Sequence, residues 1–99
     1  MNIIKTYNEK ELTVQVEGRV DTITALEFEK EIENEYGNFD SLILDFKNLE
    51  YISSAGLRAL VIIEKKLKPE GIPFTITNLN DTINEIFTIS GFDKILNIE

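Results

Sequence analysis

Residues 11 to 18, ELTVQVEG, alternate between polar and apolar side chains, with Leu12, Val14 and Val16 on one side. A period of two predicts a half-buried strand. We expect residues 2 to 7 to form its partner strand, with NEKE as the turn between them. The alternation stops after Val16, and we expect residues 18 to 21 to form a loop.

From Thr22 the spacing of the apolar residues changes to steps of three and four, which predicts a helix. The residues that carry this spacing are Ala25, Phe28, Ile32 and Tyr36. Asp21 can cap this helix, and Thr24 with Glu27 offers a capping box one turn later, so the first residue of the helix stays open. Gly37 is expected to end it.

The rest of the chain alternates between apolar strands and amphipathic helices. SLILDF reads as an interior strand, and the loop KNLEYISSAG leads into a second helix. FTIT predicts a short strand, NLND precedes a third helix that Gly91 ends, and KILNI reads as a last strand. The predicted inward side chains of the two later helices are Leu57, Leu60, Val61, Ile62, Ile63, Leu67, Ile83, Ile86 and Phe87.

This element order predicts one α/β domain over residues 1 to 99, with a largely parallel sheet of four to five strands and about three main helices. The expected loops at 18 to 21, 47 to 54 and 78 to 81 each follow a strand and precede a helix. In a parallel sheet such loops lie at one edge, where ligands usually bind. The polar side chains in these loops are Asp21, Asn48, Ser53, Ser54, Asn78, Asn80 and Asp81.

The composition narrows the chemistry. The chain has no cysteine and no histidine, so disulfides, thiolate metal sites and the commonest general base are excluded, and we expect no metal. Eighteen acidic against ten basic residues give a net charge of -8, which disfavours nucleic acid and favours a basic protein surface as partner. The first residues lack a basic region followed by an apolar stretch, and no apolar run is long enough to span a membrane. We therefore expect a soluble, cytoplasmic protein.

Two adjacent serines, Ser53 and Ser54, precede the second helix. A serine nucleophile would need a base, and neither a histidine nor an S-x-x-K or G-x-S-x-G spacing is present, so we expect no enzyme. ISSAG also lacks the spacing of a phosphate-binding loop, and we expect no cofactor. One of the two serines can cap the helix. The small residues Ala55 and Gly56 should leave a hydroxyl exposed to a docking protein.

The segment NLEYISSAGLRAL, preceded by SLILDF, resembles the signature of the STAS domain, and specifically of single-domain bacterial anti-sigma factor antagonists. VEGRVDTITALEFE and LNDTINEIFTISGFDKILNI are similar to other parts of the same family, so the resemblance covers nearly the whole chain. It implies that Ser54 is phosphorylated by a partner kinase that is also the anti-sigma factor, and that a phosphatase reverses the modification. Ser53 stands where many antagonists carry Asp, which leaves open whether Ser53 can replace Ser54.

On this resemblance we expect a protein partner, released by phosphorylation, and a chain that is a monomer or a weak dimer. Two alternatives remain: a constitutive scaffold or transporter-associated subunit, and a nucleotide-binding sensor. A phosphate brings about -1.5 to -2 charges to the first helical turn, which the fold should tolerate and a docked partner should not. The residues expected to contact the partner are Asp21, Ser53, Ser54, Ala55, Gly56, Arg58, Asn78 and Asn80.

Overall fold

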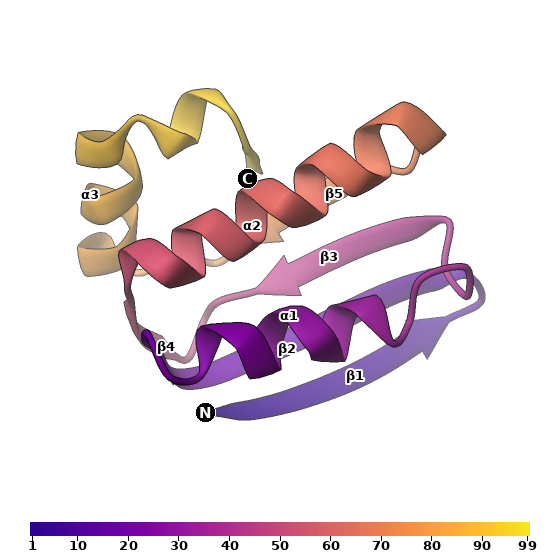
Figure 1. Ribbon diagram of the computed structural model, residues 1–99, viewed down its shortest axis with the longest axis horizontal. Coiled ribbons are helices and arrows are strands. Elements are labelled where there is room, and N and C mark those ends of the chain that lie inside the picture. The colour runs from indigo at the N-terminus through magenta and orange to yellow at the C-terminus, as the bar shows by residue number, and fades with distance from the viewer.

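Two helices cover one face of a mostly parallel sheet, and a third helix lies at one end of it (Figure 1). This arrangement comes from a computed structural model that describes residues 1 to 99. The strands are β1 Asn2–Asn8, β2 Glu11–Val20, β3 Ser41–Asp45, β4 Leu49–Ile52, β5 Phe74–Thr77 and β6 Asn97–Ile98. The helices are α1 Ala25–Glu33, α2 Ser54–Leu67 and α3 Asp81–Ser90.

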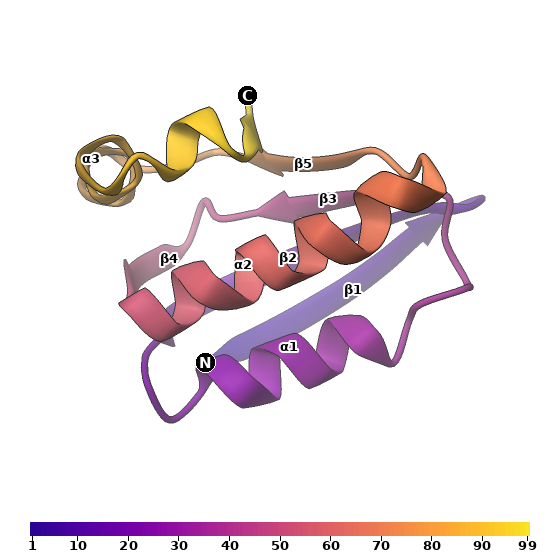
Figure 2. The ribbon, with the colours of Figure 1, turned by 45° about the horizontal axis from the view of Figure 1, so that its top comes forward.

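The sheet has the order β1-β2-β3-β5-β6, and β4 pairs with β2 beyond the end of β3. Strand β1 is antiparallel to β2, and all other pairs are parallel. Figure 2 shows α1 and α2 on the same face of this sheet, running in the same direction. The predicted fold class, a mixed α/β domain with a largely parallel sheet, is confirmed.

Strand β2 is longer than predicted, and it changes partner along its length. Its first half, from Glu11 to Gln15, pairs with β3, whereas its last residues, Gly18 to Val20, pair with β4. The register shifts between Gly18 and Arg19, and Gly18 has a φ of +87°, a conformation that costs glycine little. Residues 18 to 20 are therefore strand rather than loop, and the predicted loop of residues 47 to 54 contains the whole of β4.

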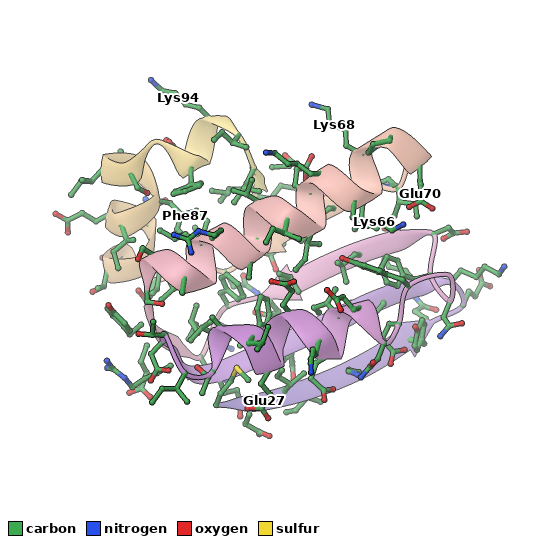
Figure 3. The ribbon with its side chains drawn as sticks, in the orientation of Figure 1. Glu27, Lys66, Lys68, Glu70, Phe87 and Lys94 are labelled. Carbon is green, nitrogen blue, oxygen red and sulfur yellow. The ribbon has the colours of Figure 1, made fainter.

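The core lies between the sheet and the helices. Alternate residues of β2 and β3 point into it, among them the predicted Leu12, Val14 and Val16. The opposite side chains remain partly exposed on a face that no helix covers. Helix α3 contributes Ile83 and Phe87, and Figure 3 shows Phe87 on the side of α3 that faces α2. All of the fully buried side chains are apolar.

Three details differ from the sequence-based predictions. Helix α1 ends at Glu33, and turns carry the chain on to Gly37, which has a φ of +89°. Ile62 was expected in the core but is 42% exposed. The last strand is only Asn97–Ile98, because the 3-10 helix Phe92–Lys94 and the turn after it occupy the chain up to Leu96.

No helix of the chain is both long enough and apolar enough to cross a bilayer.

Candidate functional site

The junctions before α1 and α2 lie side by side at the carboxyl-terminal edge of the sheet. Val20 pairs with Ile52, and the next residue, Ser53, donates its backbone N–H to the Val20 carbonyl at 2.8 Å. Asp21 and Ser53 therefore leave neighbouring strands at the same level. In Figure 1 both helices begin at this end of the sheet. The predicted edge thus exists, and it brings Asp21 and Ser54 together.

The two serines have different roles at the start of α2. Ser53 is the N-cap in extended backbone (φ -87°, ψ 173°), and its Oγ accepts a hydrogen bond from the Gly56 N–H at 3.2 Å. Ser54 is the first helical residue, is exposed, and makes no hydrogen bond through its hydroxyl. The open question of which serine caps the helix is answered: Ser53 does, and the Ser54 hydroxyl is left free.

Gly56 is buried rather than presented to solvent, which corrects its expected part in a bare first turn. A Cβ on Gly56 would lie 2.6 Å from Ile52 Cγ1 and 2.9 Å from Val20 Cγ1, closer than carbon atoms pack. The glycine is needed because the first turn of α2 lies directly against β2 and β4. Gly56 is therefore closed off from the surface of the free chain and its contact with a partner stays a prediction, whereas Ala55 is half-buried and Arg58 is exposed.

Asp21 and Thr24 hold the start of α1 together. Asp21 Oδ1 accepts backbone N–H groups from Ile23 and Thr24, both at 2.9 Å, and Thr24 Oγ1 accepts the Asp21 N–H at 2.9 Å. These backbone donors, Thr24 first, lower the pKa of the Asp21 carboxyl. Asp21 therefore holds the turn of residues 22 to 24 that leads into α1, while Thr24, the N-cap residue of α1, makes no side-chain capping bond.

Asn78 and Asn80 hold the third junction. Asn80 is the N-cap of α3: its Oδ1 accepts the Ile83 N–H at 2.8 Å, and its Nδ2 donates to the Leu49 carbonyl at 2.7 Å. Asn78 has a left-handed φ of 61° and donates from Nδ2 to Asp45 Oδ1 at 3.1 Å. Both amides are occupied by bonds within the fold, so their structural roles are established and their contact with a partner stays a prediction.

A groove of about 180 Å³ runs between α1 and α2, next to Ser54. Five of its eight lining residues are hydrophobic; the full set is Thr22, Ala25, Leu26, Glu29, Ala55, Arg58, Ala59 and Ile62. Leu26 and Ile62 are 62% and 42% exposed on its sides, and Ile23 nearby is 86% exposed. Such a cluster of exposed aliphatic side chains is typical of a protein-binding surface.

Sequence reasoning missed most of this groove, although a signal was present. Ile23 and Leu26 are three residues apart and fall outside the stripe formed by Ala25, Phe28 and Ile32. Exposed apolar side chains in the first turn of α1 and in the turn before it indicate a surface that something else covers. Only Ala55 and Arg58 of the groove belong to the predicted partner-binding set.

One unpaired positive charge lies near the start of α2. Arg58 is exposed one turn after Ser54 and takes part in no ion pair, and α2 has no acidic residue in its first turn. No group of three or more His, Cys, Asp or Glu side chains is arranged to hold a metal ion. The arrangement offers a free hydroxyl, a free guanidinium and an apolar groove in one continuous surface.

The sequence pattern of the STAS domain family matches residues 2 to 99, and the chain belongs to that family. It is 32% identical over 81 residues to the putative anti-sigma factor antagonist BtrV of Bordetella bronchiseptica, covering 81% of this chain and 70% of the relative. The anti-sigma-B factor antagonist of Bacillus subtilis is 24% identical over 98 residues, with 99% and 90% covered.

Solved structures of antagonists share the fold. An anti-sigma factor antagonist from Mycobacterium paratuberculosis superposes with a TM-score of 0.88 at 22% identity, covering 98% of this chain and 83% of that one. The Bacillus cell fate determinant SpoIIAA in its phosphorylated form superposes with a TM-score of 0.76 at 15% identity, with 99% and 91% covered. At these identities the structures support the fold alone.

Proposed function

We propose that this protein is a cytoplasmic anti-sigma factor antagonist that binds its anti-sigma factor while Ser54 is unmodified and releases it when Ser54 is phosphorylated. The anti-sigma factor is itself the serine kinase, and a phosphatase restores the unmodified chain. One observation carries the proposal: Ser54 is an exposed, unbonded hydroxyl at the first position of a helix that its neighbour Ser53 already caps. A modification of Ser54 therefore removes no hydrogen bond from the fold.

The fold should accept a phosphate at Ser54. The first N–H groups of a helix lack intrahelical partners, and the helix dipole favours negative charge there. No acidic side chain in the first turn of α2 would repel the added charge, and Arg58 lies one turn away on the same helix. A phosphate of about -1.5 to -2 charges is thus stabilised locally, and α2 stays folded.

The bound partner should not accept it. A protein that packs into the groove covers Ala55 and Arg58, and so lies within one helical turn of Ser54. Burying a dianion that has no cation or hydrogen-bond donor to pair with costs several kcal/mol. A cost of about 4 kcal/mol weakens binding about a thousandfold. The names of the matched relatives support an anti-sigma factor as the partner.

A constitutive scaffold, a transporter-associated subunit and a nucleotide sensor are the competing functions. A scaffold would use the same groove without modification of Ser54, so intact-mass analysis of the chain from its own cells separates it from a switch. A sensor would bind a nucleotide at the sheet edge, which titration with ATP and GTP tests. No lining residue of the groove favours a phosphate group beyond the single Arg58.

The test compares three variants in complex formation with the co-purified partner and in phosphorylation by it. Ser54→Ala should bind as the parent does and accept no phosphate, because the partner surface already fits a small residue there. Ser54→Glu adds about half the charge of a phosphate and should bind at least tenfold more weakly while melting cooperatively. Ser53→Ala is the matched control: it should lose about 1 kcal/mol of stability through its cap and still be phosphorylated.

Two results would overturn the proposal. The first is a Ser54→Glu chain that binds as tightly as the parent. The second is a Ser54→Ala chain that the kinase phosphorylates to the same extent.

A further inference from the structure

The groove between α1 and α2 leaves aliphatic side chains in water on both of its sides. Leu26 is exposed on the α1 side and Ile62 on the α2 side, while the floor is made of the small residues Ala25, Ala55 and Ala59. Small residues on the floor leave room for an inserted side chain, and the space of about 180 Å³ is large enough for one or two aliphatic groups. The fold itself supplies nothing that fills it.

The α1 side of the groove carries two carboxylates that lack a cation. Glu29 lines the groove, Glu33 lies one turn farther along α1, and neither forms an ion pair. Burial raises the pKa of the Glu29 carboxyl, and the neighbouring Glu33 carboxyl raises it further. Like charges four residues apart destabilise a helix, so a cation brought to this place would relieve the repulsion.

We propose that the groove binds a helical segment of a partner protein that inserts aliphatic side chains between Leu26 and Ile62 and places a Lys or Arg against Glu29 and Glu33. This inference rests on the proposed function only in taking the anti-sigma factor as the source of that segment. A helix is favoured because α1 and α2 run side by side in the same direction (Figure 2), so that a third helix can lie along the groove that their side chains form. The inserted aliphatic side chains of the segment supply most of the binding affinity, and its basic residue fixes the direction in which the segment lies in the groove.

A second copy of this chain is the poorer occupant. Each copy would bring its own Glu29 and Glu33 to the contact, and each carries a net charge of -8. Repulsion between these like charges on the two copies opposes self-association. Complementarity of charge therefore points to a basic amphipathic segment from another protein.

The groove also explains how one phosphate can control the whole contact. Its end nearest the sheet edge is formed by Ala55 and Arg58, directly after Ser54, and the carboxylates lie toward the other end. A segment in the groove thus has its basic residue away from Ser54 and its aliphatic residues next to it. A phosphate then places a dianion beside the aliphatic part of the segment rather than beside its cation.

A helical peptide library displayed on phage and selected on the full chain tests the proposal without knowledge of the partner. The enriched peptides should carry aliphatic residues at a spacing of three and four together with Lys or Arg. NMR titration with one such peptide should perturb Leu26, Glu29, Ala55 and Ile62. Enrichment of acidic peptides, perturbations centred on α3, or a dimer in sedimentation that buries the groove would overturn the proposal.

Matched variants of the chain sharpen the test. Leu26→Ser and Ile62→Ser should each weaken peptide binding by tenfold or more, whereas Ile89→Ser, at a residue 78% exposed on α3, should leave it unchanged. Glu29→Gln should weaken binding about threefold to tenfold at low salt. Its control is Glu27→Gln, since Figure 3 shows Glu27 on the side of α1 toward β1. Equal effects of the Glu27 and Glu29 variants would contradict the assigned contact.

The result also separates this inference from the proposed switch. Incorporation of phosphoserine at position 54 should reduce peptide binding at least tenfold. If the peptide binds the modified and unmodified chains equally, the groove stands and the switch fails. If no selected peptide perturbs the groove while the kinase still phosphorylates Ser54, the switch stands and the groove assignment fails.

Discussion

Helices α2 and α3 begin in the same way but differ in what their first turns can do. In each, an N-cap side chain accepts the N–H of the third helical residue: Ser53 from Gly56 at 3.2 Å, and Asn80 from Ile83 at 2.8 Å. Each cap is in extended backbone and follows the sheet. The capping bond is thus common to both helices. It does not distinguish a helix N-terminus that binds a partner from one that only stabilises the fold.

The first helical residue makes the difference. In α3 it is Asp81, which places a negative charge at the positive end of the helix dipole permanently. In α2 it is Ser54, an exposed hydroxyl that can acquire such a charge only by modification. The protein therefore shows, at α3, that its fold accepts an anion in this position, and keeps the position at α2 neutral.

The third helical residue also differs. Ile83 of α3 is fully buried and anchors its helix in the core, whereas Gly56 of α2 lets the helix backbone itself lie against Ile52 and Val20. Anchoring by backbone contact leaves the outer side of the turn small, and that is the side where Ala55 joins the groove. The close-packed Gly56 and the accessible Ser54 thus act together: the glycine brings the helix backbone against the sheet, and the serine hydroxyl stays exposed beside the groove.

The largest stability effect should come from Gly56→Ala. The new Cβ would meet Ile52 at 2.6 Å and Val20 at 2.9 Å, and overpacking of this kind costs about 1–3 kcal/mol. Each kcal/mol corresponds to about 4–8 °C in a domain of this size, which calorimetry resolves. The sign is decisive, because Gly→Ala in an open helix would instead stabilise by about 1 kcal/mol.

The two caps should differ in the cost of their removal. Ser53→Ala loses one capping bond, about 1 kcal/mol. Asn80→Ala also loses the bond from Nδ2 to the Leu49 carbonyl, so it should cost about 1 kcal/mol more. Chemical denaturation of both variants measures this. Equal losses would mean that the Leu49 bond contributes nothing and that the two starts are anchored alike.

Charge at the first helical position should act with opposite signs in the two helices. Asp81→Asn removes a favourable charge and should destabilise by about 0.3–1 kcal/mol, and Ser54→Asp should stabilise by a similar amount. Both effects should fade in 1 M salt, where the Debye length is about 3 Å. A destabilising Ser54→Asp would show that α2 does not tolerate a negative charge.

Asp21→Asn should change stability least at neutral pH and show its effect in acid. Asparagine caps about as well as aspartate. Because folding lowers the Asp21 pKa, this carboxylate stabilises the fold fully above its ordinary pKa of about 3.9 and loses that contribution as the pH falls through the lowered value. The variant should therefore lose stability less steeply than the parent as the pH falls below about 4, as followed by circular dichroism.

The same variant distinguishes a cap from a contact. If Asp21 also touches the partner, Asp21→Asn should weaken binding to the co-purified partner severalfold while the melting temperature at neutral pH hardly changes. Unchanged binding would leave Asp21 with its structural role alone.

The sequence predicted the elements whose side chains repeat with a clear period. Strands such as β3 and helices such as α3 bury one regular set of residues, so their burial pattern is visible in the chain itself. Strand β4 was missed because Glu50 and Tyr51 interrupt its apolar residues and because its only partner is the far half of β2. That pairing depends on the register shift at Gly18, which no local pattern reveals.

The candidate site was predicted unevenly for similar reasons. The position of Ser54 followed from the motif, but the division of roles between Ser53 and Ser54 depends on backbone conformation, which two adjacent hydroxyls do not disclose. Ile62 was assigned to the core because an apolar residue on a helix that packs against a sheet is usually buried. Its side chain is exposed because α1 and α2 leave a groove at this position. Packing between two helices is a property of the whole fold.

The most direct test of the central claim is site-resolved mass spectrometry of the chain after incubation with its co-purified kinase and ATP. The free hydroxyl of Ser54 and the capping bond of Ser53 predict a single phosphate, located on Ser54, in a chain that retains its thermal transition. A phosphate found on Ser53 alone, or a modified chain that has unfolded, would contradict the account.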